Sequence, residues 1–465
     1  MISKLRAHLM ASETLRTSGS AGIIVATRIV GALGTLLYTV LMARMLTPQE
    51  FGIAWTLWSV AFIVSYLSTL NIGAVAIQEV VRARATGNDS TAAGFIIISR
   101  RVLCIATLPA LVGFVGFIWW QYPAVLSAHP LAVYLAAATI PILGWNATNA
   151  AQATALDQVL RSHIPDMLLR PLGFVIILGA IWATGAPLDL EAVIGVYLGM
   201  AVLIAFVQYR LIRRFFTFMA TAKPDISDWK RWVSAGLLLA PNRLLMDRLK
   251  DVLLLISAVP LGVIGVAKMA VALSIISFLS FAISAVETAF APKTARNLIR
   301  NLADGVAPLK MERATHFIAI SGALKMAMVG AGAIGLWLFL PLLISLYGPE
   351  YSVSAAMVWW FLLIPLSSAF FGNTTLVMQI FNERIAFFIT SILALFTLSL
   401  AGIYGVPIVV ANGIDPLTAT AGLFSAIMAV LQAFRWMLCW WRTGIDVSFI
   451  GALLRRHRQL NAKLA

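Results

Sequence analysis

The sequence predicts an all-α, polytopic membrane protein with about twelve transmembrane helices in two six-helix lobes related by pseudo-two-fold symmetry. Three observations predict this class: an apolar composition, a series of long apolar runs and an internal repeat. The 465 residues are 61% hydrophobic and only 11% charged, whereas soluble globular proteins carry about a quarter charged residues. Together with a mean hydropathy of +0.92, this composition excludes a soluble domain.

Twelve apolar runs are long enough to cross a bilayer, because a core of about 30 Å requires roughly 20 helical residues. They cover approximately residues 21–45, 52–71, 102–120, 131–151, 167–184, 192–208, 233–257, 265–287, 317–340, 355–371, 385–410 and 418–436. The first run follows a polar start, carries Arg28 and lacks a clear cleavage site. We therefore expect it to be retained rather than removed as an export signal.

The distribution of basic residues predicts the orientation of these helices. If the amino terminus is cytoplasmic, the inside segments and their rims hold 27 of the 34 basic residues, and the short outside loops hold none. This positive-inside pattern places both termini in the cytoplasm. The net charge of +15 is then an orientation signal with some attraction to anionic membrane lipids, and we expect no nucleic-acid partner.

An internal repeat predicts the two lobes. The segment VSYLS at 64–68 in the second run aligns with ISFLS at 276–280 in the eighth, and the same offset aligns Pro48 with Pro260. We expect a first lobe at 1–215, a cytoplasmic linker at 216–231 and a second lobe with a basic tail at 232–465. An even number of spans per repeat gives parallel lobes, with a binding site between them near the midplane.

Seven basic residues lie within the spans or at their rims, where a charge costs about 2.5 to 3.5 kcal/mol and normally faces a partner or a watery cavity. They are Arg28, Arg44, Arg243, Arg248, Lys250, Lys268 and Lys325. We interpret Arg44, Lys250 and Lys268 as side chains that snorkel to an interface. Arg28 and Lys325 lie about two turns inside their helices, and we expect these two to face a cavity.

The seventh run opens with a charged face, on which Arg243, Asp247 and Asp251 follow each other at four-residue spacing with Arg248 beside them. One interpretation is a ladder of mutually neutralising charges. The other is that the ladder lines a cavity and exchanges partners with a charged substrate or a coupling ion. In the two-lobe frame Arg28 and Arg243 occupy matched depths. Two guanidinium groups facing one cavity would hold a phosphate group in a bidentate clamp.

Polar side chains in the fourth run extend the candidate site. Asn146 and Asn149 are candidates for binding a polar substrate, and the alternative is that such amides join helices without any ligand. Cys104 and Cys439 lie near opposite ends of the chain. This separation argues against a disulfide framework and against a metal cluster, so we expect no metal site.

Three short motifs carry a family resemblance. The run LMARMLTPQEFG at 41–52 and the tripeptide NIG at 71–73 resemble the opening of polysaccharide-type transporters of the multidrug/oligosaccharidyl-lipid/polysaccharide exporter (MOP) superfamily. LISLYGPEYSVSA at 343–355, where the ninth run meets the tenth, resembles the same proteins. Known members with this pattern are the O-antigen and exopolysaccharide flippases.

The resemblance implies a substrate and a mechanism. The substrate would be an undecaprenyl-pyrophosphate-linked oligosaccharide, moved across the bacterial inner membrane by alternating access. The energy source would be a proton or sodium gradient or the membrane potential, without an organic cofactor, and polysaccharide polymerase and export machinery would be partners. The basic cavity of the family maps onto Arg28 and Arg243. The charge pattern adds Lys325 and Arg248, with Asp247 and Asp251 as a charge network or coupling pair.

Two alternatives remain open. A membrane glycosyltransferase or polysaccharide polymerase would act on the same lipid-linked substrates, and Asp189 and Glu191 are the external acidic pair within one turn. The outside loops are too short for a catalytic domain, and we find no P-loop, nucleophile elbow or zinc spacing, so we expect no enzyme. A multidrug exporter of the same fold, coupled to a cation, is the closer competitor.

Overall fold

The computed structural model describes residues 26–303, 312–372, 374–381 and 383–451. The described part is helical and contains no strand. The first lobe holds Ala26–Met45, α2 (Pro48–Ser68), α3 (Gly73–Ala85), α4 (Asp89–Gln121), α5 (Pro123–Ala128), α6 (Pro130–Ala155), α7 (Val159–Ile164), η1 (Pro165–Leu169), α8 (Arg170–Thr184), α9 (Leu190–Ile212) and η2 (Arg213–Ala220). The two chain ends, both expected in the cytoplasm, lie outside the described residues.

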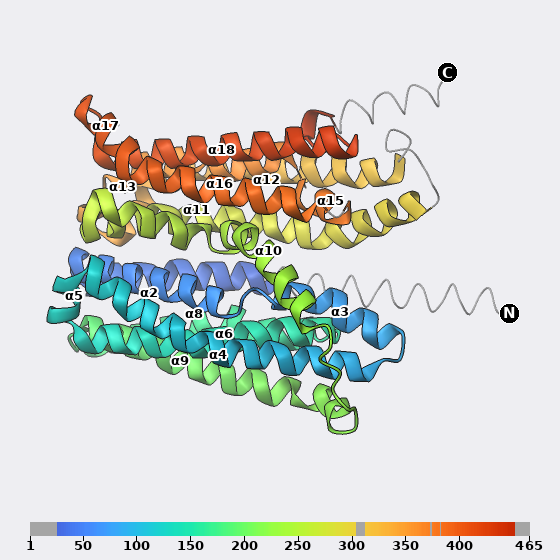
Figure 1. The fold of residues 1–465 in the computed structure, drawn as a ribbon. Helices are drawn as coiled ribbons and strands as arrows, with labels where there is room; N and C mark the ends of the chain where they lie inside the picture. The colour runs from blue at the N-terminus through green and yellow to red at the C-terminus, as the bar shows by residue number, and fades with distance from the viewer. Residues whose placement is uncertain (1–25, 304–311, 373, 382, 452–465) are drawn as a thin grey trace, which may run out of the picture.

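The second half of the chain forms the other group of helices. It holds α10 (Trp229–Asp247), α11 (Leu249–Ala303), α12 (Glu312–Tyr347), η4 (Pro349–Tyr351), α13 (Ser354–Phe361), α14 (Leu363–Phe371), α15 (Thr374–Ile380), α16 (Arg384–Leu400), η5 (Ala401–Gly405), α17 (Val406–Ala411) and α18 (Pro416–Thr443). Figure 1 shows the two groups one above the other, with α10 crossing between them. The expected boundaries at residues 215 and 231 stay a prediction.

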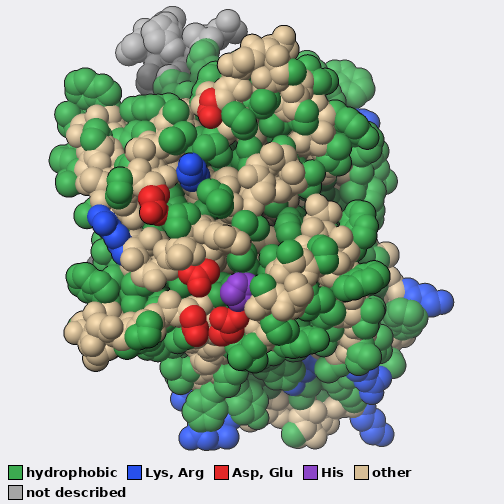
Figure 2. All heavy atoms as spheres, turned by 90° about the vertical axis from the view of Figure 1, so that its left-hand side faces the viewer, with side chains coloured by type: hydrophobic (Ala, Val, Ile, Leu, Met, Phe, Trp, Pro, Cys, Tyr) green, Lys and Arg blue, Asp and Glu red, His purple; other side chains and the backbone are tan. Residues whose placement is uncertain are grey.

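We name the two ends of the molecule after the predicted orientation. The outer end holds α5, η4 and α17, and the inner end holds α3, η2 and α15. Figure 2 looks onto the outer end, where acidic side chains and a histidine gather among hydrophobic ones. His129 there lies 2.9 Å from Glu191, between Nδ1 and Oε1.

Local sequence signals set the helix starts at the outer end. The hydroxyl of Thr47 accepts from the backbone N–H of Glu50 at 3.2 Å, and the Glu50 carboxylate accepts from the backbone N–H of Thr47 at 3.0 Å. This capping box, with Pro48 as the first helical residue, starts α2 and contributes on the order of 1 kcal/mol. Asp415 caps α18 in a related way by accepting from the N–H of Thr418 at 2.9 Å.

The helix α11 is a hairpin rather than one straight rod. Gly262 has φ 64° and ψ −177°, outside the helical region. The ammonium of Lys250 donates to the hydroxyl of Ser274 at 2.8 Å, although 24 residues along a straight helix would span about 36 Å. The two limbs of α11 therefore run antiparallel and meet at Gly262.

The hairpin and the break before it explain why the described part of the structure has fewer membrane-spanning helices than the sequence predicts. Eleven helices among the described residues are long and apolar enough to cross a membrane, whereas the sequence predicts twelve runs. The expected seventh run at 233–257 is broken, because α10 ends at Asp247 and Arg248 leaves the helical conformation with φ −129° and ψ 22°. The first limb of α11 completes this run, and the second limb contains the eighth.

The linker between the lobes lies against the first lobe. The backbone N–H of Asp225 donates to the carbonyl of Ser90 at 3.0 Å. A Cβ added at Gly94 would lie 1.7 Å from the carbonyl oxygen of Asp225, so only glycine permits this approach. The backbone N–H of Ser227 donates to the Asp225 carboxylate, which lowers the pKa of that group. This exposed carboxylate therefore stays ionised.

The repeat-equivalent helices pack on each other across the lobe boundary. The segment 64–68 lies in α2 and the segment 276–280 lies in the second limb of α11, and α2 packs along α11. A Cβ added at Gly52 would lie 1.9 Å from the carbonyl oxygen of Val263. This close approach fixes the contact between the lobes at the outer end.

Candidate functional site

Charged side chains from both lobes lie along the interface between them. Ala26–Met45 and α2 supply the first-lobe wall, and α10, α11 and α12 supply the second-lobe wall. The charges form an inner group, a middle group and a set of contacts at the outer end.

The inner group contains Arg28, which donates to the hydroxyl of Ser284 at 2.5 Å across the lobe boundary. Glu287 and Asp247 lie within electrostatic range of Arg28. The ammonium of Lys325 donates to Glu287 at 2.6 Å. Lys325 is fully buried, whereas 36% of the Glu287 side chain is exposed. Glu287 thus lies between two cations that come from different lobes.

Arg243 belongs to the same group. Its guanidinium lies 3.9 Å from the carboxylate of Asp247, and both side chains are about half exposed. Because Asp247 is also within electrostatic range of Arg28, the two arginines that the sequence pairs in a clamp share one carboxylate neighbour. The structure therefore places Arg28 and Arg243 near one carboxylate in a partly exposed region, whereas Lys325 is buried beside Glu287.

The middle group joins the first limb of α11 to α2. Arg248 lies 3.7 Å from Asp251 and 4.8 Å from the ring centroid of Phe62. The ammonium of Lys250 lies 3.7 Å from the ring centroid of Trp55, a cation–π contact of about 2 kcal/mol when desolvated. Asp251 is only 6% exposed. These contacts hold two cations and one carboxylate against the first lobe.

Two expectations about this group are wrong. Lys250 does not snorkel, because its ammonium is held between Trp55 and Ser274 at the lobe interface. The ladder on the seventh run is not one continuous face either. The break at Arg248 divides it into the pair Arg243–Asp247 and the pair Arg248–Asp251.

The outer end closes the interface with a different kind of contact. The Arg44 guanidinium donates to the carbonyl oxygens of Leu346 and Ser345 at 2.7 and 2.6 Å. These carbonyls end α12 and have no partner within the helix, so the cation compensates the negative end of its dipole. The Thr39 hydroxyl lies 3.0 Å from the Tyr347 hydroxyl. We call these contacts the outer latch.

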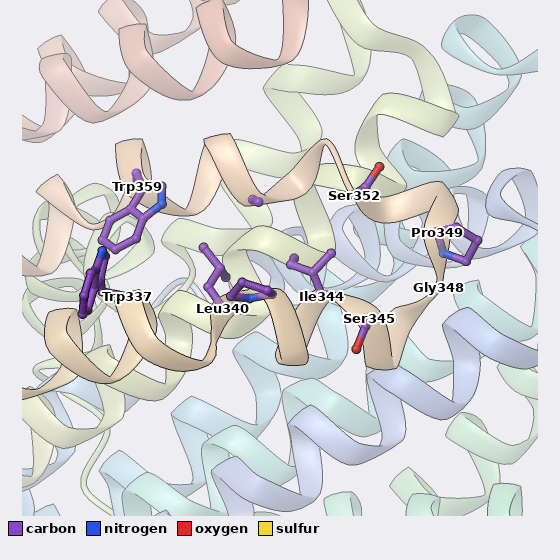
Figure 3. Close-up of a pocket in the computed structure, with 10 residues that line it drawn as sticks. Trp337, Leu340, Ile344, Ser345, Gly348, Pro349, Ser352 and Trp359 are labelled. Carbon is purple, nitrogen blue, oxygen red and sulfur yellow. The ribbon is translucent and has the colours of Figure 1, made fainter.

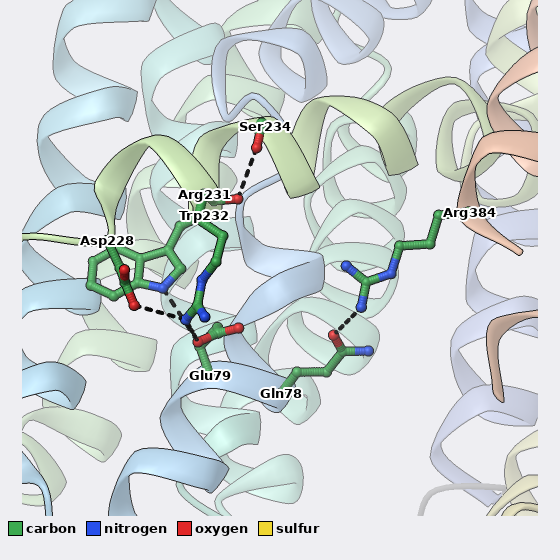
Figure 4. A network of polar contacts seen from close by, with 7 residues as sticks. All are labelled: Gln78, Glu79, Asp228, Arg231, Trp232, Ser234 and Arg384. Atoms are coloured by element: carbon green, nitrogen blue, oxygen red, sulfur yellow. Dashed lines mark hydrogen bonds and ion pairs between the residues drawn. The ribbon is translucent and has the colours of Figure 1, made fainter. Parts of the chain in front are cut away.

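The inner end has its own contacts between the lobes, shown in Figure 4. The Glu79 carboxylate in α3 accepts from Arg231 at 2.7 Å and from the indole N–H of Trp232 at 3.3 Å. Arg384 at the start of α16 donates to Gln78 at 3.0 Å. These contacts, which we call the inner latch, join α3 of the first lobe to α10 and α16.

The turn before α3 adds to the inner latch. Leu70 and Asn71 have positive φ angles of 46° and 51°, a conformation that asparagine adopts more readily than most residues. The amide of Asn71 accepts from the Tyr66 hydroxyl at 2.8 Å and donates to the carbonyl of Gly236 in α10 at 3.4 Å. These contacts explain structurally why the NIG tripeptide at 71–73 begins with asparagine.

The two candidate amides in α6 do not join the charged groups. Asn146 donates to the carbonyl of Ala201 in α9 at 3.3 Å, as a residue that joins helices does. Asn149 lines a separate pocket of about 380 Å³ with residues of α4, α9 and η2. Sequence reasoning also missed Glu287 and Ser284. The one signal that could have identified them is that both are polar residues within an apolar run, where polar side chains normally face a partner or a cavity.

A second pocket of about 580 Å³ lies between α12 and α13 at the outer end. Figure 3 shows Trp337 and Trp359 at one end of it and Gly348 and Pro349 at the other. Its lining is largely apolar, so it is unsuited to a charged head group. Within the described residues there is no group of His, Cys, Asp and Glu that could hold a metal ion.

The family comparison matches the first lobe, the linker and α10. Residues 19–247 match the model of a family described as polysaccharide biosynthesis protein. No curated protein matches the chain significantly. This match agrees with the family resemblance that the motifs indicate, over this part of the chain.

Solved structures share the fold over nearly the whole chain. An inward-facing multidrug resistance MATE family transporter of the MOP superfamily matches with a TM-score of 0.62 at 14% identity, covering 90% of this chain and 98% of that one. A MOP superfamily transporter from Pyrococcus furiosus, described as having a binding pocket of reverse polarity, matches with a TM-score of 0.63 at 15% identity, covering 90% and 94%. An outward-facing MATE transporter matches with a TM-score of 0.57 at 15% identity, covering 95% of each chain. The chain is therefore a multi-pass membrane protein with the two-lobe fold of these transporters.

Proposed function

We propose that this chain, which matches the polysaccharide biosynthesis family over residues 19–247 and has the fold of MOP transporters, is an exporter of an anionic lipid-linked oligosaccharide. The substrate is of the undecaprenyl-pyrophosphate type, and it crosses the bacterial inner membrane by alternating access with both chain termini in the cytoplasm. The observation that carries the proposal is the excess of cations at the lobe interface. Among the residues that the structure describes in the inner and middle groups, five are basic and three are carboxylates: Arg28, Arg243, Arg248, Lys250 and Lys325 against Asp247, Asp251 and Glu287.

The chemistry of the head group suits this arrangement. A pyrophosphate is anionic and its glycan is too polar to cross lipid, so both need a polar route with positive charge. Arg28 and Arg243 offer planar forks that bind phosphate oxygens in pairs, and Lys325 offers a point charge. In the absence of substrate, Glu287 and Asp247 hold these cations. The substrate phosphates replace the carboxylates, which conserves charge compensation during binding.

The carboxylates are the groups that a coupling ion would bind and neutralise. A proton or a sodium ion that neutralises Asp247, Asp251 or Glu287 raises the net positive charge of the interface and favours the anionic substrate. Release of the ion restores the carboxylate–cation pairs and favours release of the substrate. Ion binding and substrate binding are thereby coupled at these carboxylates, without an organic cofactor.

A multidrug exporter is the second candidate, and the fold likeness to multidrug resistance MATE transporters is the observation that favours it. Carboxylates at the interface would then bind a cationic drug. The surplus of basic side chains opposes this candidate. The reverse pocket polarity described for the Pyrococcus furiosus transporter accords with a fold that serves substrates of different charge.

Deletion of the gene tests the proposal. Surface or secreted polysaccharide should be lost while the lipid-linked precursor still forms on the cytoplasmic side, measured by accessibility of the precursor to a membrane-impermeant glycan probe. Precursor that reaches the periplasmic leaflet as single, unpolymerised units would support a polymerase instead. Normal polysaccharide together with increased sensitivity to cationic drugs would support the multidrug exporter.

A further inference from the structure

The pocket that contains Asn149 lies at the inner end of the first lobe, away from the charged lobe interface. Its volume is about 380 Å³, and its lining comes from α4, α6, the end of α9 and η2: Arg100, Asn149, Tyr209, Ile212, Arg213, Phe216, Met219 and Ala220. The lining contains two arginines and no carboxylate. None of these residues takes part in the outer latch or the inner latch.

Arg100 is positioned by aromatic rings rather than by an acidic partner. Its guanidinium carbon lies 5.2 Å from the ring centroid of Phe216 and 5.5 Å from that of Trp145. Its buried Nε has no hydrogen-bond partner among the described residues. Two rings thus hold a guanidinium at the pocket wall while its donors stay free for a ligand.

Asn149 adds a second donor that the fold leaves unused. The residue is only 1% exposed, and its amide Nδ2 has no hydrogen-bond partner among the described residues. Buried polar groups are ordinarily paired. A buried donor that lines a pocket beside two arginines therefore indicates that a ligand supplies the acceptor.

The surroundings of the pocket distinguish a membrane lipid from a soluble anion. Phe206, Tyr209 and Leu211 are apolar or aromatic and strongly exposed on the same end of α9, with exposed fractions of 57%, 47% and 41%. Tyr209 also lines the pocket, and Phe206 and Leu211 lie within three residues of it near the end of α9, in a candidate membrane span that continues through η2 to Ala220. An acyl chain can cover these side chains while a phosphate enters the pocket.

We propose that this pocket binds the phosphate group of an anionic membrane lipid from the inner leaflet. Arg100 and Arg213 supply the positive charge, and the Asn149 amide donates to a phosphate oxygen. The site is separate from the transport route, so this inference does not rest on the proposed function. A soluble phosphate has the same head-group chemistry but lacks the acyl chains that would contact α9.

The test measures lipid binding by the purified full-length protein in detergent. The probes are dilauroyl phosphatidylglycerol, dilauroyl phosphatidylcholine, glycerol 3-phosphate and farnesyl pyrophosphate. We expect phosphatidylglycerol to bind most tightly, and Arg100→Gln, Arg213→Gln and Asn149→Leu each to weaken it by about tenfold. Arg101→Gln is the matched control, since Arg101 is exposed next to Arg100 but does not line the pocket, and it should bind like the unmodified protein.

A second measurement keeps the test decisive if a variant folds poorly. A photoreactive phosphatidylglycerol, bound to the unmodified protein, should cross-link to the segment 206–220, as identified by mass spectrometry of the peptides. Cross-linking confined to helices that do not line the pocket, or equal binding of phosphatidylcholine, would overturn the lipid site. Equal competition by glycerol 3-phosphate would reassign the pocket to a soluble phosphate, and tighter binding of farnesyl pyrophosphate would reassign it to the carried substrate.

Discussion

At the scale of single residues, Arg28 is the most informative side chain because it reaches from the first lobe to Ser284 and lies near Glu287 and Asp247. Arg28→Ala should lower export at least about tenfold with normal protein abundance, since a charged hydrogen bond contributes about 1.5 to 3 kcal/mol. Arg28→Lys should rescue export only in part, because the point charge loses the bidentate geometry. Export per molecule of protein is the measurement. Arg101→Ala is the control, and its export should be unchanged.

The pair Arg243–Asp247 separates substrate binding from mutual neutralisation. If Arg243 serves the substrate, Arg243→Ala abolishes export and the double change with Asp247→Ala stays inactive. If the pair is only structural, the single change lowers abundance and the double change restores both abundance and export. Quantitative blotting and export assays on the three variants decide between the two, and recovery in the double variant would remove Arg243 from the substrate site.

Residue-level prediction from the sequence succeeds for some charges and fails for others for physical reasons. Arg28 and Lys325 lie deep in apolar runs, where a charge must find a partner. Arg28 finds one across the lobe boundary, and Lys325 finds one on α11 of its own lobe. Lys250 lies near a helix break. In the sequence it is within reach of a membrane interface, which predicts that its side chain snorkels. Only the hairpin at Gly262, which brings Ser274 beside it, determines where its ammonium lies.

At the scale of the helices, the contact of α2 with α11 depends on Gly52. A methyl group at this position would overlap the carbonyl oxygen of Val263, so Gly52→Ala should force the lobes apart at the outer end and destabilise the protein by about 1 to 3 kcal/mol. Thermal unfolding in detergent measures the loss. Gly116→Ala in α4 is the matched control, because nothing lies within 4 Å of its added Cβ, and an equal loss in both variants would contradict the contact.

The helices themselves are largely predictable from apolar runs, and the exceptions occur where tertiary contacts prevail. The seventh run reads as one span because 233–257 is mostly apolar, yet the structure ends α10 at Asp247. A broken helix in a membrane is tolerated where it lines a cavity or is covered by protein. Helix α3 is absent from the prediction because its sequence, with three charged residues in 13, is too polar for a span.

At the scale of the whole molecule, the orientation is open to a direct test. Reporter proteins fused after Arg84, Arg214, Arg300 or Ala465 should report a cytoplasmic location, because the basic residues gather in these segments. Fusions after Ala128, Pro187 or Gly348 should report a periplasmic one. A periplasmic location for the carboxy terminus would contradict an even number of spans and with it the two parallel lobes.

Alternating access requires the outer latch and the inner latch to open at different times, although both are closed in this structure. Cysteine pairs that replace Thr39 and Tyr347, or Gln78 and Arg384, allow each latch to be fixed with a short bis-methanethiosulfonate cross-linker, which forms reducible disulfides, after Cys104 and Cys439 are changed to Ser. Either cross-link should stop export, and reduction should restore it, because the substrate needs an opening at each end in turn.

The matched control is a pair that replaces His129 and Glu191, which lie together within the first lobe. Its cross-link should leave export unchanged. Continued export with the outer latch fixed would mean that the substrate does not pass between the lobes at that end, and the charged interface would then lose its role as the transport route.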